Sequence, residues 1–103
     1  MEQTTEHVNP DDQGPGSITI TIGPLSYAVP LSAIKDVEEN IEHEMVMLPE
    51  GKPTMLKDMC GSYVLSLEDV NISQMAWLVS KKRLADMQYQ PLEQVVILTV
   101  TQV

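Results

Sequence analysis

Five carboxylates within nine positions are the densest set of chemically active side chains in this sequence. They are Asp36, Glu38, Glu39, Glu42 and Glu44. Residues three or four apart share one face of a helix, so several of these carboxylates would follow one another about one turn apart. A row of negative charge attracts a basic protein surface and speeds the encounter with it. The spacing therefore predicts a binding site for a protein partner with a basic surface.

Several methionines follow the acidic segment closely. Met45, Met47, Met55 and Met59 surround one central loop. Methionine is flexible and common at adaptable binding surfaces, but it also fills gaps in protein cores. We expect Met45, Met47 and Met55 to form an apolar anchor for the partner beside the carboxylates, with core filling as the alternative.

Catalytic and metal-binding motifs are missing from the chain. His43 is flanked by glutamates but has no second histidine or cysteine at ligand spacing. Cys60 has no base at a motif spacing, as a nucleophile would need, and is predicted to be a buried structural thiol. The glycines form neither a dinucleotide fingerprint nor a phosphate loop. We therefore expect no enzymatic activity, no metal site and no cofactor.

The charge is distributed unevenly along the 103 residues, which carry a net charge of −9. Residues 1–16 contain four acids and no base, and residues 35–50 contain six acids and one base, while the remaining charges balance. A chain this acidic repels phosphate groups, so direct binding of nucleic acid is not expected. No apolar run reaches the roughly 20 residues that span a bilayer, so membrane insertion is not expected. The lone cysteine favours a cytoplasmic location, which would be the host cytoplasm for a phage-encoded protein.

Two regions follow from the pattern of the elements. Residues 1–16 are too polar to form a core and are predicted to be a disordered acidic arm. Residues 17–103 are predicted to form a single α+β domain. Alternating apolar residues predict strands at 17–22, 25–29 and 62–67, the first two as a hairpin. The more uniformly apolar segment 95–100 predicts a central strand.

Helical spacing of apolar residues occurs twice. The first helix is expected to be capped by Ser32 and to end before Pro49, or alternatively near Glu42 with residues 44–48 extended. The second is expected to be capped by Asn71 or Ser73 and to cover residues 72–88. The basic triplet 81–83 would lie in its last turns and form a face of opposite charge. The predicted fold is a small antiparallel or mixed sheet of about four strands with two helices, either open or a partly open barrel.

Three segments of the sequence resemble two known families. The stretch 18–37, through its parts 20–23, 27–31 and 34–37, resembles the opening hairpin of chemotaxis coupling (CheW-like) domains. The segment 61–69 is similar to a later strand of theirs. That resemblance implies a barrel fold and a role as a signalling adaptor. The sequence Met47-Leu48-Pro49-Glu50 is similar to the first strand of small acidic phage inhibitors of uracil-DNA glycosylase. It implies an inhibitor that imitates the charge of nucleic acid.

The leading hypothesis is a small acidic, non-enzymatic protein-binding module. By analogy, it would be an inhibitor from a phage or mobile element that occupies a basic groove of a nucleic-acid-binding host protein. One alternative is a structural subunit of a phage particle or scaffold, in which copies form a homo-oligomer through exposed strands. The other alternative is a CheW-like signalling adaptor.

Overall fold

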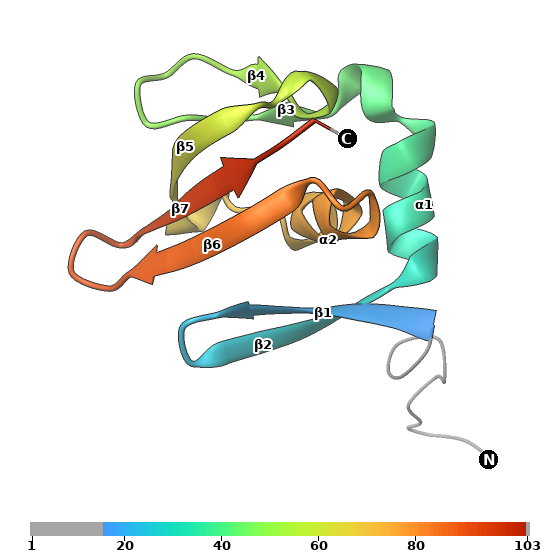
Figure 1. The fold of residues 1–103 in the computed structure, drawn as a ribbon, viewed down its shortest axis with the longest axis horizontal. Helices are drawn as coiled ribbons and strands as arrows, with labels where there is room; N and C mark the ends of the chain where they lie inside the picture. The colour runs from blue at the N-terminus through green and yellow to red at the C-terminus, as the bar shows by residue number, and fades with distance from the viewer. Residues whose placement is uncertain (1–15, 103) are drawn as a thin grey trace.

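The computed structural model describes residues 16–102 (Figure 1). It confirms the predicted α+β class, with two helices and antiparallel strand pairing. Seven strands are present in these residues, in two sheets of two strands and one of three, where the sequence predicts about four strands. The predicted disordered arm, residues 1–16, lies outside the described residues apart from Gly16.

The described residues begin with the predicted hairpin of β1 (Ser17–Ile22) and β2 (Leu25–Pro30), which pair antiparallel. Ile20 and Ile22 are buried, Thr21 is exposed and Thr19 is more exposed than either isoleucine, as the alternation requires. Gly23 makes the turn with a φ of +57°, a left-handed conformation that glycine adopts without a steric penalty.

The first helix, α1 (Leu31–Glu39), follows β2 directly. Ser32 therefore lies inside the first turn and does not cap the helix, because the extended Pro30 occupies the cap position. The buried side chains of Ile34 and Val37 fix this helix to the core. Its end corresponds to the shorter of the two predicted alternatives, and the prediction of a helix running to Pro49 is wrong.

Short elements replace the rest of that predicted helix. A 3₁₀ turn, η3 (Ile41–His43), leads into β3 (Met45–Val46), which pairs antiparallel with β4 (Thr54–Met55). A second 3₁₀ turn, η4 (Leu56–Asp58), follows β4. Asn40 ends α1, where its backbone N–H donates to the carbonyls of Asp36 and Val37.

The largest sheet has the strand order β5-β7-β6, from β5 (Gly61–Ser66), β6 (Leu84–Gln90) and β7 (Val95–Val100). The central position of β7 confirms the prediction from its apolar sequence. Val96, Leu98 and Val100 point to the core and are 0–1% exposed. The 3₁₀ turn η5 (Leu67–Asp69) leaves the end of β5.

The second helix, α2 (Ile72–Ser80), is much shorter than predicted. Asn71 caps it as expected, because its side-chain oxygen accepts from the backbone N–H of Gln74 at 3.1 Å. The prediction that residues 81–88 continue the helix is wrong. Lys82 turns the chain with a φ of +59°, and Leu84–Gln90 forms β6. A shift of register between Leu84 and Asp86 interrupts the alternation of side chains in β6. The sequence pattern therefore does not indicate a strand in this segment.

The core lies around α2, which contacts α1, β1, β2 and β6. Its side chains Met75, Ala76 and Leu78 are completely buried. In Figure 1 the three-stranded sheet lies between the β3–β4 pair and the β1–β2 hairpin, and α1 runs along one side of the molecule. Within residues 16–102 there is no helix with the length and apolar character needed to cross a membrane.

Candidate protein-binding site

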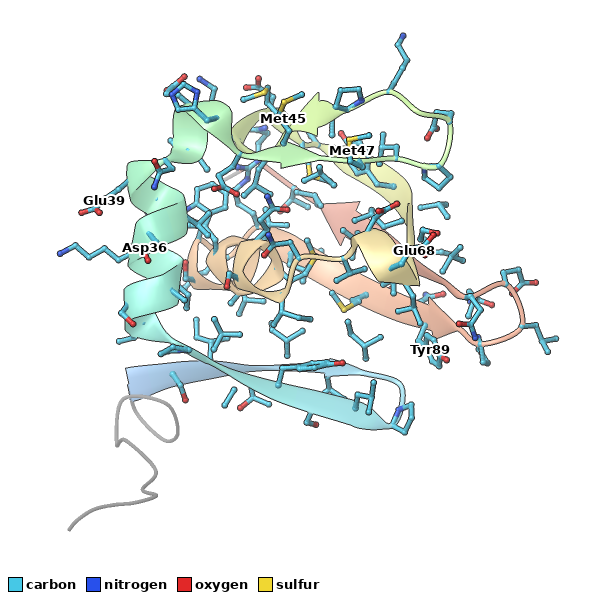
Figure 2. All side chains as sticks on the ribbon, turned by 180° about the vertical axis from the view of Figure 1, so that it is seen from behind. Asp36, Glu39, Met45, Met47, Glu68 and Tyr89 are labelled. Atoms are coloured by element: carbon cyan, nitrogen blue, oxygen red, sulfur yellow. The ribbon has the colours of Figure 1, made fainter. Side chains whose placement is uncertain are left out.

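The five predicted carboxylates do not form a single row. Asp36, Glu38 and Glu39 lie on α1, whereas Glu42 lies in η3 and Glu44 directly before β3. The chain changes direction after Glu39, so the last two carboxylates leave the face of the helix. Figure 2 shows Asp36 and Glu39 at the end of the molecule opposite to Glu68 and Tyr89.

Glu38 joins the two helices. Its Oε1 accepts hydrogen bonds from Lys81 Nζ and from Trp77 Nε1, each at 2.8 Å. The hydrogen bond from Lys81, followed by that from Trp77, lowers the pKa of Glu38 below its ordinary value. This carboxylate is therefore occupied within the fold and contributes little free charge for a partner.

Glu42 and Glu44 are also engaged within the fold. Glu42 forms a hydrogen-bonded ion pair with Lys57 of η4, which lowers the pKa of Glu42 and raises that of Lys57. Glu44 Oε1 accepts from Nε2 of the buried Gln74 at 2.7 Å, and the same amide nitrogen donates to the carbonyl of Met45 at 3.3 Å. These contacts fix the segment that carries the methionines.

Free negative charge on α1 remains at two positions. The Asp36 carboxylate has no ion pair or side-chain hydrogen bond within the described residues. Glu39 lies 4.0 Å from Lys35, and both side chains are mostly exposed, so this pair leaves the carboxylate accessible to a partner.

Two of the predicted methionines are strongly exposed. The side chains of Met45 and Met47 are 48% and 46% exposed, and Figure 2 shows them on the same side of the molecule. Met55 pairs with Met45 across β3 and β4 and is half-buried. Met59 is completely buried, as the core-filling alternative predicts. The structure therefore brings Met45, Met47 and Met55 together on one small sheet and its continuation.

Cys60 differs from the sequence prediction. It is exposed, because the strand that follows begins at Gly61 on the open edge of the sheet. Its backbone N–H donates to the hydroxyl of Tyr63 at 2.8 Å, and that hydroxyl donates back to the Cys60 carbonyl at 3.0 Å. No cluster of three or more His, Cys, Asp or Glu side chains within residues 16–102 could hold a metal ion.

The basic triplet does not form a separate face. Lys81 is paired with Glu38, and Arg83 is only 8% exposed. The Arg83 guanidinium donates to the carbonyls of Lys57 at 3.1 Å, Met59 at 2.5 Å and Thr101 at 3.0 Å. These residues fasten η4 and the end of β7 to the turn after α2. The prediction that residues 81–83 form a face of opposite charge is therefore wrong.

An apolar pocket of about 160 Å³ lies at the other end of the molecule from the acidic side chains of α1. It is lined by side chains from the β1–β2 hairpin, η5, the start of α2 and β6, namely Ile22, Pro24, Leu25, Tyr27, Leu67, Val70, Ile72 and Tyr89. The pocket is difficult to predict from the sequence because its walls come from four separate segments. The one signal in the sequence is the apolar pair Pro24-Leu25 at a turn.

The chain matches no protein-family model, and comparisons with curated proteins and with solved structures give no match. The resemblances to CheW-like domains and to glycosylase inhibitors therefore rest on short sequence segments.

Proposed function

We propose that this chain is a non-enzymatic protein-binding module that contacts its partner through Met45 and Met47. The observation that carries the proposal is their exposure, 48% and 46%, in a fold that buries Met59 and Met75 completely. Flexible apolar side chains grouped on a surface are typical of adaptable contact sites. Met55 supports this group from the neighbouring strand.

The accessible carboxylates indicate what kind of partner surface would fit this site. Asp36 and Glu39 keep accessible negative charge on α1, whereas Glu38 and Glu42 are paired with lysines. A partner with an apolar contact area and a basic rim fits this arrangement better than a long basic groove. Blocking a nucleic-acid-binding groove of a host protein remains a narrower form of the proposal, and it requires binding that weakens steeply with salt.

Site-specific photocrosslinking tests the contact surface. A photoreactive amino acid at position 47 of the full chain would be irradiated in a lysate of the source organism, with position 92 as a control. Leu92 is 92% exposed and lies on the distant β6–β7 turn. We expect a covalent partner from position 47 only. Equal crosslinking from both positions would contradict the proposal.

Quantitative binding to the crosslinked partner then separates the apolar and charged contributions. We expect the double variant Met45→Ser and Met47→Ser to lose most of the binding, because it removes the apolar anchor. The double variant Asp36→Lys and Glu39→Lys should weaken binding mainly at low salt. Binding that is flat from low to high salt would exclude charge mimicry while leaving the methionine contact in place.

A second candidate function, as a subunit of an assembly, is favoured by the outer edge of β5. Within the described residues β5 pairs only with β7, and the N–H of Leu67 donates to the Gln94 carbonyl. By alternation, the backbone groups of Ser62, Val64 and Ser66 point away from β7. A second copy could add a strand to this edge.

Sedimentation velocity over a range of concentrations tests that assembly. Val64→Pro would remove an outward N–H without breaking the ladder with β7, so it should abolish association through this edge. Val64→Thr keeps the N–H and is the matched control. A wild-type chain that remains monomeric at high concentration would exclude the assembly function.

A further inference from the structure

The apolar pocket beside Tyr89 has the size of one large apolar side chain. Its volume is about 160 Å³. An apolar cavity of about 150 Å³ holds one benzene molecule, whereas pockets for drug-sized ligands and cofactors measure roughly 300–1,000 Å³. A nucleotide or a larger cofactor would not fit, but a single leucine or phenylalanine side chain would.

The pocket has both fixed and accessible walls. A Cβ atom placed on Gly23 would lie 2.4 Å from Cδ2 of Tyr89, so the hairpin turn already touches the aromatic ring and restricts its movement. Leu25 and Tyr27 are 54% and 38% exposed and stand at the accessible side. The apolar wall of the pocket is therefore preformed, and binding of a side chain would require little rearrangement of the protein.

Two exposed carboxylates belong to the same segment as two lining residues of the pocket. Glu68 and Asp69 belong to η5, directly between the lining residues Leu67 and Val70, and both are exposed. Neither carboxylate has an ion pair or side-chain hydrogen bond in the part of the chain that the structure describes. Figure 2 shows Glu68 on the same side of the molecule as Tyr89. The two carboxylates would therefore attract a cation that lies next to the entering side chain.

We propose that this pocket binds one leucine- or phenylalanine-sized side chain of a partner peptide that carries lysine or arginine directly beside it. Pocket volume selects the anchor side chain, and the two carboxylates select its basic neighbours. Deeply seated anchors of this kind supply most of the affinity in many interfaces. The pocket shares no residue with the Met45 and Met47 surface, so the two proposals succeed or fail separately.

Nuclear magnetic resonance titration of the full chain tests the proposal with short capped peptides. The probe is arginine–phenylalanine–arginine, and the controls are arginine–glycine–arginine and glutamate–phenylalanine–glutamate. We expect the probe to shift backbone amides of the pocket lining. Both controls should bind at least about tenfold more weakly, because each lacks one of the two recognised groups.

Variants of the pocket locate the binding. Val70→Phe fills the space and should abolish the shifts, and Tyr27→Ala at the accessible side provides a second test that does not depend on repacking. Reversing both rim charges, Glu68→Lys with Asp69→Lys, should weaken the probe at least about fivefold, whereas Glu50→Lys should not. Thermal denaturation would establish that each variant is folded.

Three results would overturn the proposal. The glycine control could bind as tightly as the phenylalanine probe, which would indicate charge attraction alone. The probe could shift amides elsewhere and leave the pocket lining unchanged. Finally, the pocket amides could shift with protein concentration in the absence of peptide, which would make a second copy of this chain the occupant.

Discussion

The indole N–H of Trp77 on α2 donates to the carboxylate of Glu38 on α1 over 2.8 Å, and Lys81 reaches the same oxygen at 2.8 Å. Trp77 is only 5% exposed, so its N–H needs this acceptor. Glu38 consequently holds the two helices together. A mutation of Glu38 would affect the stability of the fold as well as the binding of a partner. Charge reversal at Asp36 and Glu39 is therefore the cleaner test of binding.

Acid should weaken this link between the helices. Because the pKa of Glu38 is lowered by Lys81 and Trp77, its stabilising contribution is complete above the ordinary glutamate pKa of about 4.3. That contribution is lost as the pH falls through the lower pKa of the folded chain. We expect thermal denaturation between about pH 5 and pH 3 to show a smaller loss of stability for Glu38→Gln than for wild type. Glu39→Gln is the control, and parallel curves for Glu38→Gln and wild type would contradict the prediction.

Leu98 in the central strand should be among the most sensitive core positions. It is 0% exposed. Leu98→Ala removes buried apolar area and leaves a cavity, so we expect a loss of about 2–5 kcal/mol in the free energy of unfolding. Leu92→Ala is the matched control, because Leu92 is 92% exposed and its truncation should change that free energy by less than about 0.5 kcal/mol. Urea denaturation measures both variants, and equal losses would contradict the assigned burial.

Local signals predicted much of this fold. The strict alternation of Ser17–Ile22 identifies β1 because one face of the hairpin is buried and the other exposed. Asn71 identifies the start of α2 because a capping contact is local in sequence. Leu84–Gln90 could not be identified, because pairing with β7 and the register shift override its local pattern. The αL turn at Lys82 also lacks a glycine that would have marked the end of the helix.

The candidate site was less predictable than the fold. The sequence shows that carboxylates are concentrated in residues 36–44. It does not show that Lys81 pairs with Glu38 or that Lys57 pairs with Glu42. These partners come from distant elements that meet only in the folded chain. Exposure of Met47 and burial of Met59 also depend on the path of the chain after β3 and β4. Both positions hold methionine, so the residue type does not distinguish them.

Arg83 should be essential for stability, although arginine side chains usually lie at the protein surface. Its guanidinium donates to three backbone carbonyls, those of Lys57 in η4, Met59 directly after η4 and Thr101 directly after β7. Hydrogen bonds from a charged donor contribute about 1.5–3 kcal/mol each, so we expect Arg83→Met to lose at least about 3 kcal/mol. Lys52→Met is the charge-matched control in an exposed loop. A loss no larger than that of the control, measured by urea denaturation, would contradict this role.

The contact between Gly23 and Tyr89 can be measured with a matched pair of glycines. Gly23 and Gly51 have φ values of +57° and +84°, so alanine at either position meets backbone strain of about 1–3 kcal/mol. An added Cβ would lie 2.4 Å from the Tyr89 ring at Gly23, but would meet nothing within 4 Å at Gly51. We therefore expect Gly23→Ala to cost at least about 1 kcal/mol more than Gly51→Ala.

Removing the ring completes this test. In a Tyr89→Ala background the steric contact is absent, so Gly23→Ala should cost no more than Gly51→Ala does in the same background. Urea denaturation of the single and double variants gives the coupling energy directly. If Gly23→Ala costs the same with and without the Tyr89 ring, the hairpin turn does not rest on that ring, and the pocket wall is not fixed by this contact.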